Sequence, residues 1–117
     1  ARPHAIMTSY NLLNGVHTSE SAELLETVLR DEWGFEGLVM TDWVVAGMTR
    51  HDLKHPAATS APTIKAGNEL FMPGCETDRQ GILSALRGRG EQVELSRSEL
   101  EKQAARVVRM VWALAGS

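Results

Sequence analysis

A carboxylate and an indole stand together at the end of an apolar run. Residues 37–43 read Gly-Leu-Val-Met-Thr-Asp-Trp, so apolar and β-branched residues follow a glycine and precede Asp42 and Trp43. Such a run is typical of a buried strand, and parallel α/β proteins place catalytic acids at the carboxyl ends of their strands. Asp42 is therefore the first candidate for chemistry.

Three roles suit a carboxylate at this position. It can cap the next segment as a purely structural group. It can be the nucleophile of a phosphoaspartate hydrolase, which needs a second acid two residues on, where Val44 stands. It can serve a glycosidase, which needs a second acid and an aromatic surface for sugar, and Trp43 and Tyr10 can supply that surface. The structural and glycosidase roles both stay open on residue types alone.

Other chemical motifs in the sequence are weaker. His51 and His55 are four residues apart with Asp52 beside the first, which resembles a shortened zinc-protease signature, but Pro56 follows and a third ligand is not evident. We therefore expect no metal ion. The glycine spacing matches neither a phosphate-binding loop nor a Gly-x-Ser-x-Gly elbow, so nucleotide hydrolysis and serine chemistry are unsupported and no cofactor is expected.

Composition and charge argue against some classes of binding partner. The 117 residues carry a formal net charge of -3, and the basic stretch at 87–90 is followed by Glu91 and Glu94, so a nucleic-acid partner is not expected. No apolar run approaches the roughly 20 residues that span a bilayer, so a membrane is not expected either. Cys75 is alone, which excludes a disulfide framework. The compartment stays open.

The elements that must position Asp42 alternate between strand and helix patterns. We expect a strand at about 5–10, a loop at 11–17, a helix from about 19 to Gly34, strands at about 37–43 and 69–72, a loop with short helical turns at 44–63, and terminal helices at about 77–87 and 97–114. Alternation of this kind predicts an α/β fold with a parallel sheet. Three strands cannot close a barrel, so we expect a slice of a larger fold.

Capping residues and an apolar stripe give more detail on the two predicted terminal helices. Thr77 with Gln80, and Ser96 with Glu99, each fit the capping box at a helix start. An apolar stripe along the last helix is expected to pack in the core, and its members are Leu100, Ala104, Val107, Val108, Val111 and Leu114.

Five segments in order resemble glycoside hydrolase family 3, the β-glucosidase-type family. They are Met-Thr-Ser-Tyr-Asn at 7–11, Asn-Gly at 14–15, Leu-Arg-Asp-Glu-Trp-Gly-Phe-Glu-Gly at 29–37, Thr-Asp-Trp at 41–43 and Ala-Gly-Asn-Glu-Leu-Phe-Met-Pro-Gly at 66–74. The resemblance implies that residues 1–117 are part of the N-terminal (β/α)8 TIM barrel domain, about strands 6 to 8 with their helices. The final helix would then lead into a sandwich domain.

The resemblance also implies roles for four residues. Asp42 would be the catalytic nucleophile, Met7 and Tyr10 would line the subsite of the reacting sugar, and Trp43 would lie beside it. The implied reaction is retaining hydrolysis of a terminal β-linked sugar in an oligosaccharide or glycoside, through a glycosyl-enzyme intermediate. The family's acid/base comes from outside these segments, so the isolated chain is expected to be inactive, with the rest of the barrel and a sandwich domain as partners. We expect Glu69, which the family does not use as the acid, to be a buried structural group.

A second hypothesis comes from another class of protein. The chain begins with a strand pattern about five residues after Ala1 and looks like an excerpt from a longer protein. If it exists alone, it would be a non-catalytic α/β module that forms a homo-oligomer through exposed sheet edges. The sugar and the linkage that a complete enzyme would recognise are not indicated by the sequence.

Overall fold

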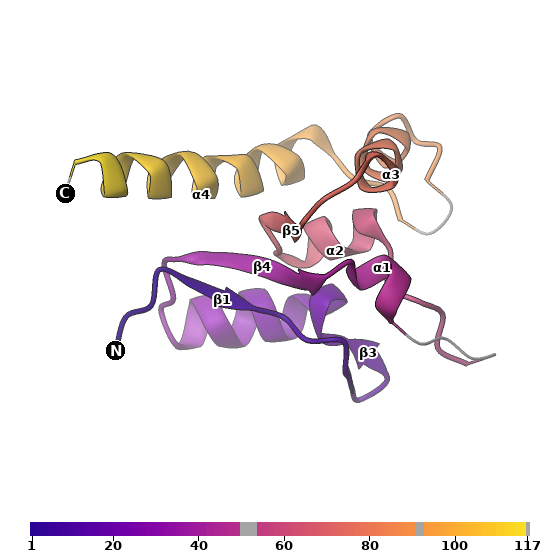
Figure 1. The fold of residues 1–117 in the computed structure, drawn as a ribbon, viewed down its shortest axis with the longest axis horizontal. Helices are drawn as coiled ribbons and strands as arrows, with labels where there is room; N and C mark the ends of the chain where they lie inside the picture. Colours follow the sequence, from indigo (N-terminus) through magenta and orange to yellow (C-terminus); the bar gives the residue numbers. More distant parts are fainter. Residues whose placement is uncertain (50–53, 91–92, 117) are drawn as a thin grey trace.

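The computed structural model describes residues 1–49, 54–90 and 93–116 (Figure 1). Its elements in chain order are β1 (Ala5–Met7), β2 (Leu12–Leu13), β3 (Val16–His17), the 3₁₀ turn η1 (Thr18–Glu20), the π-helix η2 (Glu23–Glu32), β4 (Leu38–Trp43), α1 (Val45–Met48), α2 (Ser60–Ala66), β5 (Leu70–Met72), α3 (Glu76–Leu86) and α4 (Arg97–Ala115). Strand and helix thus alternate along the chain.

A parallel sheet organises these elements. Its order is β1-β4-β5, with Met7 opposite Met40 and Met40 opposite Leu70. The crossover from β1 to β4 runs through η2, and the crossover from β4 to β5 runs through α2. The α/β class with a parallel sheet is therefore as predicted, and β4, which carries Asp42, is the central strand.

The first strand is shorter than the sequence indicates. It ends at Met7 rather than near residue 10, because the following residues leave the sheet for a hairpin of β2 and β3. Asn14 and Gly15 have φ angles of 52° and 80° at the tip of this hairpin, as in the tight turns that join two antiparallel strands. The segment expected to be a loop at 11–17 is therefore partly ordered as β-structure.

Helices cover one face of the sheet. Val39 is fully buried in a cluster with Leu25 and Leu29 of η2 and Ala66 of α2. A second cluster joins α2, α3 and the segment before α4, and it comprises Ala61, Ile64, Ala85 and Leu95 with Phe71 packed against it. Successive side chains of a strand point to opposite faces, so Val39 and Phe71 mark the covered face.

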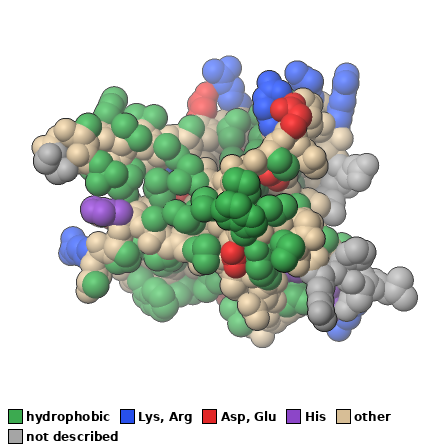
Figure 2. Space-filling model, in the orientation of Figure 1, with side chains coloured by type: hydrophobic (Ala, Val, Ile, Leu, Met, Phe, Trp, Pro, Cys, Tyr) green, Lys and Arg blue, Asp and Glu red, His purple; other side chains and the backbone are tan. Residues whose placement is uncertain are grey.

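The opposite face of the sheet is open within the described residues. Met7, Met40 and Leu70 lie side by side on it; Met7 is 58% exposed, and Met40 and Leu70 are partly exposed. Hydrophobic side chains form a band across the middle of the molecule in Figure 2. Parallel sheets are normally covered on both faces, so this exposed apolar face departs from the usual arrangement.

Of the apolar stripe of α4, Leu100 packs against the second cluster as expected, but most of the other members do not pack in the core. Val108 and Val111 are 46% and 56% exposed, whereas the inward side of the helix carries Gln103, which is buried, and Arg106. The physical reason is charge: buried Glu69 needs a cation, and Arg106 faces it. No helix of the described residues has the length and hydrophobicity that crossing a bilayer would require.

The two predicted capping boxes have different outcomes. The Ser96 box is confirmed, because Ser96 Oγ accepts from Glu99 N at 3.1 Å and Glu99 Oε2 accepts from Ser96 N at 2.9 Å. The Thr77 box is wrong. The α3 helix begins at Glu76, and Asp78 Oδ2 instead accepts from Cys75 N at 3.2 Å, which shifts the start signal by two residues.

Candidate active site at the end of β4

Asp42 lies in a β-bulge. Between the pair Met40–Leu70 and the pair Trp43–Met72, β4 advances three residues while β5 advances two. Thr41 and Asp42 together therefore oppose the single residue Phe71. A bulge bends its strand and changes the direction of the side chains that follow, and bulges are common beside active sites.

Hydrogen bonds from β5 hold the bulge closed. Thr41 Oγ1 accepts from Met72 N at 2.9 Å, and Val44 N donates to Met72 O at 2.6 Å. Val44 takes the left-handed conformation, with φ 48° and ψ 53°, which a β-branched residue adopts at a cost of about 1–3 kcal/mol. The neighbouring bonds must overcome this cost, so the turn after Asp42 is specified by tertiary contacts.

Tyr10 reaches Asp42 from the segment between β1 and β2. Its hydroxyl donates to Trp43 O at 2.5 Å. Removal from water raises the pKa of the Tyr10 hydroxyl, and the charge and hydrogen-bonding of the Asp42 carboxylate raise it further. Tyr10 is therefore a protonated donor beside Asp42, whose own Oδ1 accepts from Trp43 N at 2.7 Å.

Met7 and Trp43 face the same side of the sheet. Met7 pairs with Met40, and the extra residue of the bulge turns Trp43 to that side instead of the helix-covered side. Both are more than half exposed. The structure therefore gathers Asp42, Tyr10 and Trp43 at one edge, with Met7 about 7 Å further back along the strands at about 3.3 Å per residue.

Buried polar residues that sequence analysis missed position the loop that carries Tyr10. Asn68 is fully buried, donates to Ser19 O at 2.6 Å and Thr63 O at 2.8 Å, and accepts from Thr8 Oγ1 at 3.1 Å. Thr18 Oγ1 accepts from Ser9 N at 3.0 Å. The only sequence signal for Asn68 was its place in the family-like segment at 66–74.

Glu69 is a buried structural acid of an unexpected kind. Its Oε2 accepts from Val39 N at 2.6 Å, as a structural role predicts. Its Oε1 also accepts from Arg30 Nη2 and Arg106 Nη1, each at 3.0 Å, and the side chain is completely buried. Arg106 further binds Glu26 at 2.8 Å. This network joins η2, α4 and the base of β4, and spacing in the sequence did not reveal it.

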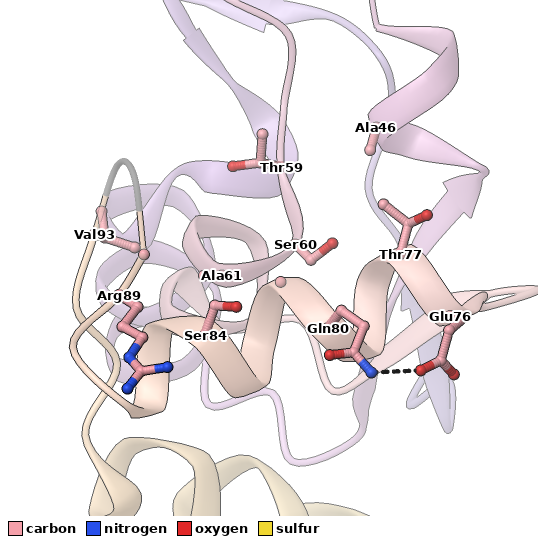
Figure 3. Close-up of a pocket in the computed structure, with 12 residues that line it drawn as sticks. Ala46, Thr59, Ser60, Ala61, Glu76, Thr77, Gln80, Ser84, Arg89 and Val93 are labelled. Carbon is pink, nitrogen blue, oxygen red and sulfur yellow. Dashed lines mark hydrogen bonds between the residues drawn. The ribbon is translucent and has the colours of Figure 1, made fainter.

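A separate cavity of about 560 Å³ lies between α2 and α3 (Figure 3). Its lining includes Ser60, Gln80, Ser84 and Arg89, and Gln80 donates to Glu76 Oε1 at 2.6 Å. Neither Asp42 nor its three companion site residues line it. The described residues contain no cluster of three metal-ligating side chains, and His51 and Asp52 of the weak metal motif lie outside the described residues.

Comparisons with known proteins agree on one family. The model of the glycosyl hydrolase family 3 N terminal domain matches residues 1–110. An exo-α-(1→6)-L-arabinopyranosidase of Bifidobacterium breve is 42% identical over 83% of this chain, and a probable β-glucosidase K of Emericella nidulans is 40% identical over 95%. The structure of a GH3 β-glucosidase of Bifidobacterium adolescentis matches with 40% identity and a TM-score of 0.69 over 95% of the chain. The chain spans only 11%, 12% and 14% of these three proteins.

Proposed function

This chain belongs to glycosyl hydrolase family 3, and we propose that it is the part of a retaining, β-glucosidase-like hydrolase that supplies the nucleophile, Asp42. In this proposal β1, β4 and β5 are about strands 6 to 8 of a (β/α)8 barrel, and α4 leads into a sandwich domain. The observation that carries the proposal is the bulge at the carboxyl end of β4, which presents Asp42 beside Tyr10 and Trp43.

The small share of each relative that the chain covers supports a role as part of a larger enzyme. The open apolar face of the sheet is consistent with that role, since the rest of a barrel would cover it.

The proposed chemistry is a double displacement at the anomeric carbon. An Asp42 oxygen attacks the anomeric carbon, the bond to the leaving oxygen breaks, and that oxygen takes a proton from an acid. Water, deprotonated by the same group, then releases the sugar from Asp42. Tyr10 donates beside the carboxylate and helps to orient it, while Trp43 and Met7 offer apolar surface to the sugar.

The acid/base is proposed to come from the rest of the enzyme. It must lie about 5–5.5 Å from the nucleophile in a retaining enzyme. Glu69 does not suit this role, because its carboxylate is buried and held by two guanidinium groups and a strand amide. Glu76 binds Arg79 and Gln80 on α3.

The test is covalent labelling of the complete protein that carries this chain. A 2-deoxy-2-fluoro-β-glucoside is expected to inactivate it and to add its sugar to Asp42, as located by peptide mass spectrometry. Asp42→Asn is expected to abolish turnover, whereas Asp31→Asn, at an exposed helical position, is the matched control and keeps it. Labelling of another residue, with Asp42→Ala fully active, would refute the assignment. The isolated 117-residue chain is expected not to hydrolyse a nitrophenyl β-glucoside.

Substrate preference is tested with two nitrophenyl glycosides. The β-D-glucoside is the first candidate because several similar proteins carry the name β-glucosidase. The α-L-arabinopyranoside is the second, because the Bifidobacterium breve relative is 42% identical over most of the chain. The ratio of kcat/KM for the two compounds decides between them.

A second candidate function is an assembly module without catalysis. It is favoured by the open face and by β1 and β5, which lie at the two edges of the described sheet. Size-exclusion chromatography with light scattering on the 117-residue chain tests it. A defined homo-oligomer supports this role, and a well-behaved monomer counts against it.

A further inference from the structure

The β4–β5 ladder is completed by side chains at both ends. At its start, Glu69 Oε2 accepts from Val39 N, where a backbone carbonyl would normally accept. At its end, the hydroxyl of Thr41 accepts from Met72 N at 2.9 Å. This second bond, in which a side chain replaces a backbone acceptor, lies inside the bulge directly before Asp42. Thr41 is only 1% exposed.

We propose that the Thr41 hydroxyl is a positioning group for the nucleophile, because it holds β5 against the bulge that sets the direction of Asp42. The inference rests on the proposed function of Asp42. Three bonds fix the backbone around this residue: Thr41 Oγ1 to Met72 N, Met72 O to Val44 N, and Trp43 O to the Tyr10 hydroxyl. Two of them involve the backbone of Met72, so Met72 anchors the bulge to β5.

The Thr41 bond can be removed by a substitution that keeps the shape of the side chain. Valine matches threonine in volume and branching but cannot accept a hydrogen bond. Without this acceptor, the Met72 amide must find another partner, and β5 shifts relative to the bulge. The strained turn at Val44 is then free to relax, which moves the Asp42 carboxylate.

The expected effect is on the chemical step. Misplacement of a reacting group by about 1 Å can cost about 100-fold in rate. In the complete protein, Thr41→Val is expected to lower kcat about 10- to 100-fold and to leave KM within about threefold. The rate of labelling by the fluoroglycoside is expected to fall in parallel. Thr41→Ser, which retains the acceptor and loses the methyl group, is expected to keep kcat within about threefold.

Matched controls separate positioning from packing. Thr63→Val removes another buried hydroxyl, which donates to Thr59 O at 2.7 Å in α2, and is expected to leave kcat unchanged. If Thr41→Val retains kcat within about threefold, the inference is wrong. If Thr41→Val fails to fold, Thr41→Ser decides, and a loss of tenfold or more in its kcat overturns the inference. Failure of wild-type labelling at Asp42 would instead refute the proposed function on which it rests.

Discussion

Removal of the Glu69 carboxylate is expected to destabilise the chain strongly. The perturbation is Glu69→Ala. It removes the acceptor of Val39 N at 2.6 Å and of Arg30 and Arg106, each at 3.0 Å. The two arginine side chains are only 9% and 11% exposed, so water cannot readily replace the carboxylate.

The size of the effect follows from these contacts. Breaking a buried ion pair by removing one partner costs about 3–5 kcal/mol. Arg106 keeps its bond to Glu26, and Arg30 keeps a bond of 3.3 Å to Phe35 O, which limits the loss. We therefore expect the free energy of unfolding to fall by about 3–5 kcal/mol, a large part of the roughly 5–15 kcal/mol that stabilises a typical domain.

The assay is urea denaturation followed by circular dichroism. With an m-value of about 2 kcal/mol/M, a loss of about 4 kcal/mol moves the midpoint by about 2 M. The matched control is Glu76→Ala, because Glu76 also lies 3.0 Å from an arginine but is 68% exposed. It should change the free energy of unfolding by no more than about 0.5 kcal/mol. A loss below about 1 kcal/mol for Glu69→Ala, or equal losses for the two variants, would refute the reasoning.

Three further predictions concern stability. Burial raises the pKa of Glu26, but the hydrogen bonds and charge of Arg106 outweigh this effect and leave the pKa below its ordinary value. Glu26→Gln should therefore destabilise the protein near neutral pH. Its stability should approach that of wild type as the pH falls through the lowered pKa. Burial raises the pKa of Glu20, so the wild-type protein loses stability as the pH rises through that raised pKa. Glu20→Gln should therefore be at least as stable as wild type at neutral pH. In acid the two proteins should have similar stability. Urea midpoints across the pH range check both, and parallel pH profiles for the two variants would contradict them. Gly37→Ala should lower the melting temperature and the free energy of unfolding, the latter by about 1–3 kcal/mol, because the added Cβ would overlap a backbone carbonyl. Gly81→Ala in α3 has room for a Cβ and should be neutral or stabilising. Similar effects at both glycines would be evidence against this account.

Local features of the fold follow from local sequence. Leu38 to Trp43 form a strand where the apolar run predicts one, and Ser96 with Glu99 begins α4 as its capping box indicates. Such features depend on neighbours within a few residues, so periodicity and caps suffice to predict them. The Thr77 box failed because Asp78, two positions before Gln80, caps the helix together with Cys75.

Prediction is weaker where charge and distant contacts decide. The apolar stripe of α4 was expected to face the core, yet Arg106 faces inward to reach Glu69, which is 37 residues away in the sequence. Hydrophobic periodicity describes the spacing of apolar residues and cannot predict a charged partner that is distant in the sequence. The same holds for Asn68, whose three hydrogen bonds reach Thr8, Ser19 and Thr63.

The sequence by itself determined that an acid follows a buried strand of a parallel α/β sheet, and its motifs pointed to the family of sugar hydrolases. Only the tertiary structure decided how that acid is held. The bulge at Asp42 exists because β5 is one residue shorter than β4 across the same span, and because Thr41 and Tyr10 bond across strands. Register between strands is a property of pairs of segments, so residues far apart in the chain had to meet before the direction of Asp42 was defined.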